Sequence, residues 1–506
     1  MSLLLGIDVG TTGSKAILLE PNGEVIAEAT AEYPMTVPKP GWAEQNPEDW
    51  WQATIKSVRQ VLISARGETI AGIGLTGQMH GLVLLDEAGR VLWPCIMWND
   101  QRTAAQCAEI ERKVGREKLI ELAGKPALTG FTAGKVLWVR ENEPDIHRRA
   151  RHVLLPKDYV RYRLTGTLAM DVADGSGTLL MDVGRRAWSD ELLELLDIPR
   201  EWLPKLHESH EVVAEVSVEG SSATGLHAGI PVVAGAGDQA AQSIGTGIAG
   251  EGIVSVTVGT SGVVFAATSS YTFDPTGELH AYCHAVPDTW HLMGVTLSAG
   301  GSLRWFRDAL CQLEKAEAAR TGRDVYDIIT ELAATAPVGS DGLLFLPYLT
   351  GERTPHADPD ARGVFFGLSL RHTKAHMARA VLEGVTFSLR ECLDLLCELG
   401  QSCARVRVSG GGSRSAFWRQ MMADVFGTEI VEVNVTQGAA YGAALLAGVG
   451  TGVYANAEQA CERTIRETGS TKPGPHAGSY ADAYERYRAL YPVLAPEFKR
   501  DAQARS

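Results

Sequence analysis

The stretch LLLGIDVGTTGSKA, residues 3–16, decides the fold of this chain. An apolar, β-rich run leads into a Gly-Thr-Thr-Gly turn, and a second such run continues to Leu19, which is the pattern of two strands joined by a tight turn. Residues 252–268 read GIVSVTVGTSGVVFAAT and repeat that pattern. The turn glycines Gly10 and Gly259 lie 249 residues apart (259 − 10), close to half of the 506 residues. This repeat predicts a duplicated architecture of two similar domains.

The remainder of each half alternates β-rich and helical patterns. Because strands and helices are mixed throughout, we expect an α/β class in which helices cover the sheets, with domains at 1–246 and 247–506. Ligands of such folds lie at strand ends, and a cleft between two similar domains is the default site. We expect strands at 72–76, 230–234, 342–346 and 406–409, a hairpin at 82–92 with its turn at 86–89, helices at 377–399 and 416–426, a loop at 468–478 and a final helix after it.

Composition and charge exclude several classes of function. Hydrophobic residues make up 45% of the chain and charged residues 21%, as in soluble globular proteins. The formal net charge of −14 gives no general attraction for nucleic acid or an anionic membrane. No run approaches the roughly 20 apolar residues of a spanning helix, and the N-terminal run is expected to be a strand and not a signal peptide. Eight cysteines without a CxxC pair indicate reduced, mostly buried thiols in a cytoplasmic enzyme.

The first turn carries the residues of an anion site. Glycines let backbone N–H groups approach a phosphate, Thr11 and Thr12 add hydroxyl donors, and Lys15 adds a positive charge. Asp8, at the end of the first strand, would hold a hydrated Mg²⁺ ion, because Mg²⁺ retains several waters. An isolated GTTG is more often an ordinary hairpin turn. The second turn, residues 259–262, favours the other interpretation, in which two turns hold a triphosphate.

Two further glycine-rich bends follow strands. Asp238 comes after the bend that ends the strand at 230–234. It either caps a helix or accepts a proton from a substrate hydroxyl, and its local sequence leaves both open. Residues 410–412 are three successive glycines between a strand and a helix, which favours close approach of a flat ring such as adenine over a simple connector. The small residues of 438–448 indicate a closely packed helix.

Other short motifs point to a different class of protein and are weaker. Residues 72–77 match G-x-G-x-x-G and residues 235–240 match G-x-G-x-x-A, the pattern of dinucleotide-binding oxidoreductases. Such a site needs a helix that opens on the last glycine. The first match is followed by the predicted hairpin instead, and the second would direct Asp238 at a pyrophosphate. We therefore do not expect a nicotinamide cofactor.

Taken together, the motifs resemble those of the FGGY carbohydrate kinases over nearly the whole chain. The resemblance implies a duplicated actin-like, ribonuclease H-like fold, with sugar and ATP in a central cleft between two domains, and it suggests a homodimer. It is carried by GIDVGTTGSKA at 6–16, QMHG at 78–81, WND at 98–100, LPKDY at 155–159, GDQAA at 237–241, LPYL at 346–349, GERTPH at 351–356 and GGG at 410–412.

The resemblance also implies roles for single residues. Asp238 matches the general base of the family, and Asp8 matches an aspartate required for activity near the metal. The remaining positions divide into phosphate-binding Thr11, Thr12, Lys15, Gly259 and Thr260, nucleotide-contacting Gly300, Arg304, Gly411 and Ser415, and sugar-binding Met79, His80, Trp98, Asn99, Asp238 and Gln239.

The pair Met79-His80 discriminates between substrates within this resemblance. Family members with Met-His phosphorylate D-xylulose, whereas glycerol kinases carry Arg-Glu at these positions. Gln239 and Ser415 are each asparagine in some relatives. The alternatives are a kinase for ribulose, gluconate or glycerol, and a non-enzymatic actin-like module that only binds ATP. The expected ligands are thus D-xylulose, ATP and Mg²⁺.

Overall fold

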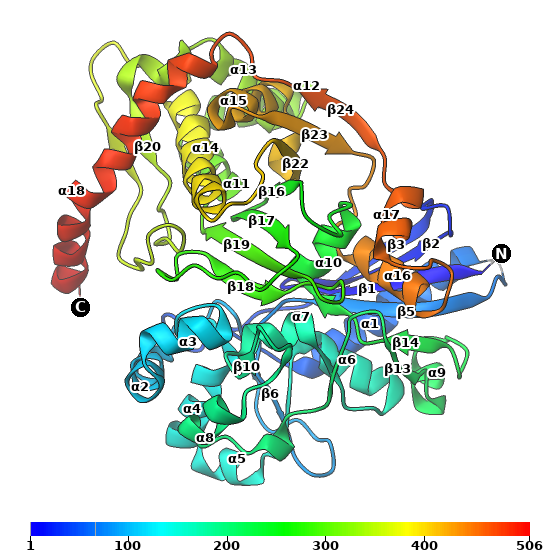
Figure 1. Cartoon of the computed structure of the whole chain (residues 1–506). Coiled ribbons are helices and arrows are strands. Elements are labelled where there is room, and N and C mark those ends of the chain that lie inside the picture. Colours follow the sequence, from blue (N-terminus) through cyan, green and yellow to red (C-terminus); the bar gives the residue numbers. More distant parts are fainter. Residues whose placement is uncertain (1, 66, 506) are drawn as a thin grey trace. The chain divides into compact units, whose positions relative to one another are not determined.

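The computed structural model describes residues 2–65 and 67–505, which form two compact units (Figure 1). Unit 1 consists of the segments Met1–Gly250, Ala267–His291 and Gln437–Arg466. Unit 2 consists of Glu251–Ala266, Leu292–Thr436 and Glu467–Ser506. The chain therefore leaves unit 1 and returns to it twice.

A mixed sheet forms the centre of unit 1, in the order β13-β14-β5-β1-β2-β3, with β15 also paired to β5. β1 and β2 are antiparallel and joined by the Gly-Thr-Thr-Gly turn, which confirms the first predicted hairpin. β5 and β15 run parallel to their partners. The strands are β1 (Leu3–Val9), β2 (Gly13–Leu19), β3 (Val25–Glu32), β5 (Ile70–Gly77), β13 (Val212–Glu215), β14 (Pro231–Val233) and β15 (Ala236–Gly237).

Glycines on one face of this sheet admit helix α16 (Ala439–Gly450) at backbone contact distance. A Cβ atom at Gly74 would lie 1.9 Å from the carbonyl oxygen of Ala443, and one at Gly6 would lie 2.0 Å from that of Ala440. Side chains alternate along a strand, so Leu3, Leu5, Ile7 and Val9 of β1 face the other way, where α1 (Pro47–Leu62) covers them. The predicted packing of the small-residue run is confirmed.

The rest of unit 1 is mainly helical around a second apolar core. The predicted turn of the 82–92 hairpin forms, with Gly89 N–H donating to Asp86 O at 2.9 Å, but β6 takes β8 as its strand partner. The elements are β6 (Val83–Leu85), β8 (His152–Leu154), α2 (Ala104–Val114), α3 (Arg116–Ala123), α4 (Thr132–Asn142), α5 (Pro144–Arg149), α6 (Pro156–Thr165), α7 (Val172–Gly175), α8 (Asp190–Leu196), α9 (Val218–Thr224), α10 (Asp238–Gly245), α17 (Ala457–Thr464) and β18 (His280–Cys283).

Unit 2 repeats the central pattern, with strands in the order β19-β17-β16-β22-β23-β24. β16 and β17 are antiparallel around the Gly-Thr-Ser-Gly turn, and β22 runs parallel to β16, as β5 does to β1. The second hairpin and the duplication are thus confirmed. The strands are β16 (Val254–Val258), β17 (Gly262–Thr268), β19 (Trp290–Thr296), β20 (Leu344–Leu346), β21 (Val364–Phe366), β22 (Arg405–Ser409), β23 (Glu429–Val433) and β24 (Glu467–Thr471).

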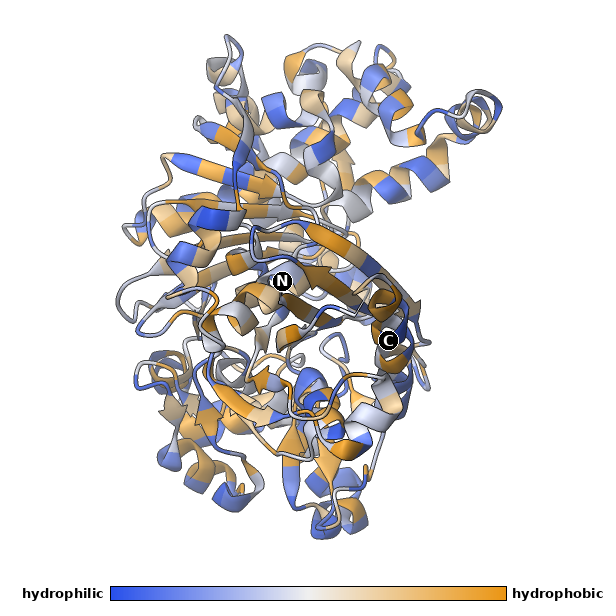
Figure 2. Cartoon of the chain, turned by 90° about the vertical axis from the view of Figure 1, so that its right-hand side faces the viewer, coloured by the Kyte–Doolittle hydropathy of each residue, from blue (hydrophilic) through white to orange (hydrophobic). Residues whose placement is uncertain are grey.

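Helices surround this second sheet, and the two helices predicted for unit 2 are confirmed together with the last one. In Figure 2 the strands are coloured mostly as hydrophobic, whereas the helices alternate hydrophobic and hydrophilic residues. One expectation is wrong, because the predicted loop at 468–478 begins as strand β24, which pairs with β23 through its backbone. The helices are α11 (Gly300–Leu310), α12 (Gln312–Thr321), α13 (Val325–Ala334), α14 (Lys374–Glu398), α15 (Ala416–Phe426) and α18 (Ala481–Arg505).

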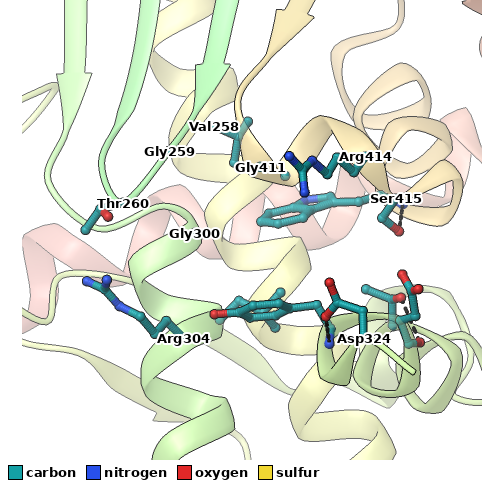
Figure 3. A pocket seen from close by; sticks show the side chains of 15 residues that line it. Val258, Gly259, Thr260, Gly300, Arg304, Asp324, Gly411, Arg414 and Ser415 are labelled. Atoms are coloured by element: carbon teal, nitrogen blue, oxygen red, sulfur yellow. Dashed lines mark hydrogen bonds between the residues drawn. The ribbon is translucent and has the colours of Figure 1, made fainter. Parts of the chain in front are cut away.

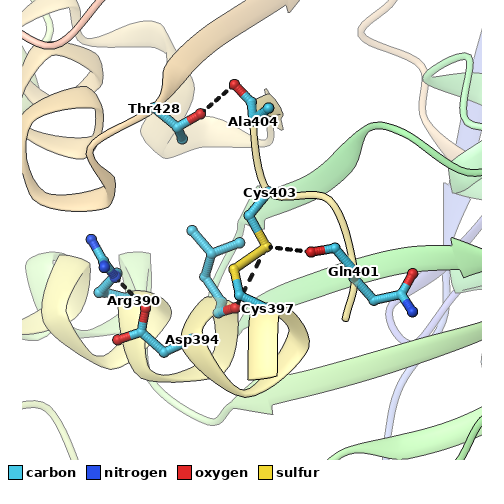
Figure 4. Close-up of a disulfide and its surroundings, with 8 residues drawn as sticks. Arg390, Asp394, Cys397, Gln401, Cys403, Ala404 and Thr428 are labelled. Atoms are coloured by element: carbon cyan, nitrogen blue, oxygen red, sulfur yellow. Dashed lines mark hydrogen bonds and ion pairs between the residues drawn. A yellow bond between two sulfur atoms is a disulfide. The ribbon is translucent and has the colours of Figure 1, made fainter. Parts of the chain in front are cut away.

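The cysteines depart from the expectation of reduced thiols at one point. Cys397, near the end of α14, forms a disulfide with Cys403 in the following loop, with Cα atoms 6.1 Å apart (Figure 4). The other six cysteines are buried and form no disulfide, as expected. Among residues 2–65 and 67–505, no helix combines the length and the apolar character that crossing a bilayer requires.

Candidate active site

The register of three strands brings the predicted catalytic residues of unit 1 together. Asp8 on β1 is paired with Thr76 on β5, and Thr76 is paired with Ala236 on β15. These strands are parallel, so the segments that follow them leave the sheet at the same edge. The first turn, the Met79-His80 pair and Asp238 at the start of α10 therefore all lie at this edge.

Asp8 and Asp238 form an interacting pair of carboxyl groups. Burial raises the pKa of Asp8 to about 6, and the charge of Lys15 opposes that rise. Burial, and after it the charge of Asp8, raises the pKa of Asp238 to about 7, while Gln239 donates its amide to Asp238 Oδ1 at 3.3 Å. The Oδ1 atom of Asp8 is buried without a hydrogen-bond partner. The pair can therefore accept a proton near neutral pH or bind a cation.

Side chains from outside the first turn fix its backbone. Tyr33 donates its hydroxyl to Gly10 O at 2.5 Å, and Gln45 donates its amide to Thr11 O at 2.8 Å. Trp98, a predicted sugar-binding residue, donates its indole N–H to the Thr11 hydroxyl at 3.1 Å. Predicted sugar and phosphate residues are thus in direct contact here.

Two other residues predicted for the first phosphate turn have different surroundings. Thr12 is exposed. Lys15 forms an ion pair with Glu28 at 3.0 Å, and its side chain remains partly exposed. The charge of Lys15 still acts on Asp8. Its contact with a phosphate stays a prediction.

A buried lysine stabilises an unusual backbone conformation at His80. His80 has φ of 68°, in the left-handed region that costs a non-glycine residue about 1 kcal/mol or more. Lys135 donates its ammonium to His80 O at 2.8 Å and to Gly130 O at 2.7 Å, and Thr132 adds a hydroxyl donor to His80 O at 3.1 Å. Burial lowers the pKa of Lys135 to about 7. These donors stabilise the strained residue.

Polar and aromatic side chains that the sequence analysis missed lie beside His80. Its Nδ1 is 3.0 Å from Gly177 O, and its ring stacks 6.3 Å from that of Tyr282. His291 stacks on the same tyrosine at 5.2 Å, and the Lys125 ammonium lies 3.8 Å from the tyrosine ring centroid. Burial lowers the pKa of both His291 and Lys125 well below their usual ranges. The available signal was the polar pattern HAYCH at 280–284 within a buried strand.

A buried cluster of ionisable side chains lies close to Gly237 and Met79, and the sequence analysis did not predict it. A Cβ atom at Gly237 would lie 3.0 Å from Met79 Cγ and 3.2 Å from Asp174 Oδ1. The Lys157 ammonium lies 3.3 Å from Asp174 Oδ2 and 2.6 Å from Asp171 Oδ2, and all three side chains are fully buried. The segment that carries Asp238 thus packs against a buried cluster of acids and Lys157, in which burial raises the pKa of Asp174 well above its usual range.

The loop at 98–100 is positioned by Asp100. Its buried carboxylate accepts from Ala43 N–H at 2.6 Å and from the Arg102 guanidinium at 2.7 Å. The neighbouring Asn99 presents a buried Oδ1 atom that has no hydrogen-bond partner. An unsatisfied buried amide oxygen can accept a hydrogen bond from a ligand hydroxyl.

In unit 2, the two predicted phosphate-binding residues and the four predicted nucleotide-contacting residues line one cavity of about 630 Å³. Figure 3 shows Thr260 and Arg304 at one end of this cavity and Ser415 and Asp324 at the other. The predicted residues are Gly259, Thr260, Gly300, Arg304, Gly411 and Ser415, together with Gly412 of the predicted glycine run, and those that the sequence analysis missed are Val258, Leu303, Asp324, Tyr326, Asp327, Thr330, Arg414 and Trp418.

The three glycines at 410–412 have different reasons to be glycine. Gly410 has φ of 84°, in the left-handed region. A Cβ atom at Gly412 would lie 2.5 Å from Val258 Cγ1. A Cβ atom at Gly411 would meet nothing within 4 Å, so this position alone faces open space. A flat ring can approach the backbone at Gly411, while the aromatic Tyr326 and Trp418 supply apolar lining.

Within residues 2–65 and 67–505, no group of three or more His, Cys, Asp or Glu side chains is arranged to hold a metal ion. A cation beside Asp8 would take its other ligands from water or from a bound phosphate, as Mg²⁺ commonly does. The partnerless Asp8 Oδ1 is a hard oxygen ligand that fits this ion.

Comparison with known proteins agrees with this geometry. Residues 3–245 match the N-terminal domain of the FGGY family of carbohydrate kinases, and residues 254–451 match its C-terminal domain. A xylulose kinase from Bacillus subtilis is 39% identical over 97% of both chains, and a gluconokinase from the same species is 33% identical over 97% of this chain and 95% of that protein. The crystal structure of a ligand-bound xylulose kinase from Lactobacillus acidophilus is 28% identical, with a TM-score of 0.92 over 99% of this chain and 100% of that chain.

Proposed function

Because this chain belongs to the FGGY family of carbohydrate kinases, we propose that it transfers the γ-phosphate of ATP to the terminal hydroxyl of D-xylulose. The product is D-xylulose 5-phosphate. The observation that carries the proposal is the Asp8–Asp238 pair at the same sheet edge as Met79 and His80. The xylulose kinases to which the chain is similar support the choice of sugar.

Asp238 acts as the general base in this proposal. Its carboxylate accepts the proton of the attacking hydroxyl while the sugar oxygen forms a bond to the γ-phosphorus and the bond to the β-phosphate oxygen breaks. ADP leaves with the electron pair of that bond. A pKa of about 7 suits this task, because the group is both ionised and basic near neutral pH.

Asp8 holds Mg²⁺ through water or directly, and the ion offsets charge on the phosphates when it is bound. The first turn, with Thr11, Thr12 and Lys15, binds phosphate beside it. The cavity of unit 2 binds the nucleotide, with adenine against Gly411 and the phosphates toward Thr260 and Arg304. Sugar and nucleotide have to meet in one reaction complex for transfer to occur. We extend the proposal to a cytoplasmic location and a homodimer.

Gluconate is the second candidate acceptor, because the chain is also similar to a gluconokinase. The side chains around His80 and Tyr282 favour an uncharged sugar as the substrate. Burial lowers the pKa of His284 to about 3 and that of His291 well below its usual range, so both imidazole rings are neutral at pH 7, and burial also lowers the pKa of Lys125 well below its usual range. Neutral imidazole rings give a carboxylate no cationic partner. We therefore expect D-xylulose to be preferred over gluconate.

A coupled ADP-release assay with D-xylulose, L-ribulose, glycerol and gluconate tests the substrate. D-xylulose should give the highest kcat/KM, and a clear preference for another sugar contradicts the specificity but leaves the kinase. Asp238→Asn should lower kcat by about 10²–10⁴ and leave ADP affinity largely intact. Asp190→Asn, at an exposed aspartate of unit 1, is the control and should retain full activity. Near-normal turnover by Asp238→Asn rejects the general base.

A further inference from the structure

The stretch GERTPH at 351–356 has no residue in the nucleotide cavity, yet it carries a buried acid. The Glu352 side chain is 3% exposed and lies within unit 2. A buried carboxylate is costly unless several donors satisfy it. Its partners therefore indicate what the residue does.

We propose that Glu352 is a positioning residue that holds the second phosphate turn, residues 259–261, in its nucleotide-binding form. It acts through the segment that joins β19 to α11, residues 295–301. The inference rests on the proposed nucleotide site of unit 2 and adds to it a residue that touches no ligand. Three sets of contacts support it.

The first set ties Glu352 to the end of β19. Its Oε1 accepts from Leu297 N–H at 2.8 Å and also from Arg353 N–H at 2.8 Å. Its Oε2 accepts from the Thr296 hydroxyl at 2.6 Å. Burial raises the pKa of Glu352 to about 7, so these three hydrogen bonds hold a carboxyl group that is only partly ionised at neutral pH. Glu352 thus anchors two successive residues of the joining segment.

The neighbouring Thr354 reinforces the same anchor. Its hydroxyl accepts from Val295 N–H at 3.1 Å, and its own N–H donates to Val295 O at 3.0 Å. Three successive residues, 295–297, are therefore bonded to the GERTPH stretch. Glu352 also exchanges two backbone hydrogen bonds with Asp358, at 2.9 and 3.0 Å, which close the loop that carries it.

The second set ties the joining segment to the turn. Ala299 and Gly301 donate their N–H groups to Thr260 O at 2.9 and 3.0 Å, and Gly300 donates to Gly259 O at 2.8 Å. The approach is close enough to require glycine, since a Cβ atom at Gly300 would lie 2.6 Å from Gly259 O. The carbonyl groups of the turn are thus held by the segment that Glu352 anchors.

The third set fills the space between these parts. Ser388 of α14 donates its hydroxyl to Thr296 Oγ1 at 3.0 Å. A Cβ atom at Gly262 would lie 2.6 Å from Thr296 Cγ2, so Thr296 packs directly against the end of the turn. A shift of Thr296 therefore has to displace either the turn or helix α14. Both routes connect Glu352 to Gly259 and Thr260 without crossing the cavity.

A purely structural role would predict a different result, and a matched residue separates the two. Glu383 is also a buried acid of unit 2, 1% exposed. It accepts from Arg379 Nε at 2.8 Å, from the Ser340 hydroxyl at 2.9 Å and from Gly339 N–H at 2.9 Å. None of these residues lines the nucleotide cavity. Glu383→Ala should therefore lower stability without a specific effect on nucleotide.

The test compares full-length variants by calorimetric titration with ADP and by steady-state kinetics. Glu352→Ala should raise the Kd of ADP and the KM of ATP about tenfold or more, the change expected for loss of one strong hydrogen bond. The KM of D-xylulose should change less than about twofold. Glu352→Gln should recover most of the affinity, because its amide oxygen can still accept from Leu297 and Arg353.

Two further results decide the matter. Thr296→Val, which removes the hydroxyl between Glu352 and Ser388, should weaken ADP binding by an intermediate factor and covers the case in which Glu352→Ala does not fold. The positioning role is overturned if Glu352→Ala and Thr296→Val bind ADP as tightly as Glu383→Ala does while the three variants have a similar Tm. Failure of the wild-type protein to bind ADP rejects the nucleotide site itself, and a different preferred sugar leaves the inference about Glu352 standing.

Discussion

The raised pKa of Asp238 predicts a steep pH dependence of the reaction. A base with a pKa of about 7 is about 90% ionised at pH 8 and about 10% ionised at pH 6, so kcat/KM for the sugar should fall about tenfold between them. An aspartate at the ordinary value of 3.8 would stay almost fully ionised at both pH values, and the rate would not change. The coupled ADP-release assay at saturating Mg·ATP measures this profile.

Asp8 provides the internal control for this profile. Its negative charge is the second cause of the raised Asp238 pKa, after burial. In the protein without Mg²⁺, Asp8→Asn should therefore move the titration of Asp238, followed by carboxyl NMR, to lower pH. The maximal rate of this variant with Mg·ATP should fall because the metal ligand is lost. The two carboxyls interact, so the measured midpoints belong to the pair. A wild-type kcat/KM that is flat from pH 6 to pH 8 refutes the assignment of Asp238 as a general base in this environment.

The same pKa shift has a consequence for stability. A carboxyl whose pKa is raised in the folded state contributes stability below pH 3.8, and that contribution is lost as the pH rises through about 7. Between pH 5 and pH 8 this single group should cost the wild-type protein about 3 kcal/mol. Asp238→Asn does not ionise, so its Tm should exceed that of the wild type by more at pH 8 than at pH 5. An equal difference at both pH values contradicts the shift.

Two further predictions concern the fold. Gly74→Ala should lower the free energy of unfolding by about 3 kcal/mol, because the new Cβ would lie 1.9 Å from Ala443 O and force α16 away from the sheet. Thermal unfolding measures this loss. Gly250→Ala is the control and should leave stability unchanged, because a Cβ atom at Gly250 would meet nothing within 4 Å. Cys403→Ser should lose about 2 kcal/mol, because the disulfide closes a short loop. The wild-type protein in reductant should then unfold like this variant, and an unchanged Tm in both cases means that the disulfide adds no stability.

Local patterns were sufficient to predict most of the fold. The two hairpins were found because apolar runs and turn glycines are signals within about 15 residues. The helix at 416–426 was predicted with the bounds that the structure has. β24 was missed because its residues, ETGST, are polar and mostly exposed, and only pairing with β23 makes them a strand. Pairing at a sheet edge depends on a distant partner that a local pattern does not contain.

The residues of the candidate site likewise divide into those that local sequence motifs predict and those that depend on the folded structure. Residues in recognisable motifs, such as Asp8, Met79 and Asp238, could be proposed from the sequence. The lysines that support the site could not, although Lys125, Lys135 and Lys157 are all fully buried. Lysine is almost never fully buried unless it is paired, so the expected place for it is the surface. Their partners include the carbonyls of Ser176 and His80, 51 and 55 residues away from Lys125 and Lys135, which only the folded structure brings close to them.

The two halves of the duplication hold the same kind of turn by different means. In the first turn, the carbonyls of Gly10 and Thr11 accept from the side chains of Tyr33 and Gln45. In the second turn, the carbonyls accept from the backbone amides of residues 299–301. Side-chain substitutions should therefore disturb the first turn directly, whereas the second should be disturbed by crowding Gly300 or by releasing the segment that Glu352 and Thr296 hold. The repeated sequence motif thus defines the shape of the turn, and residues outside it determine how firmly each copy is held.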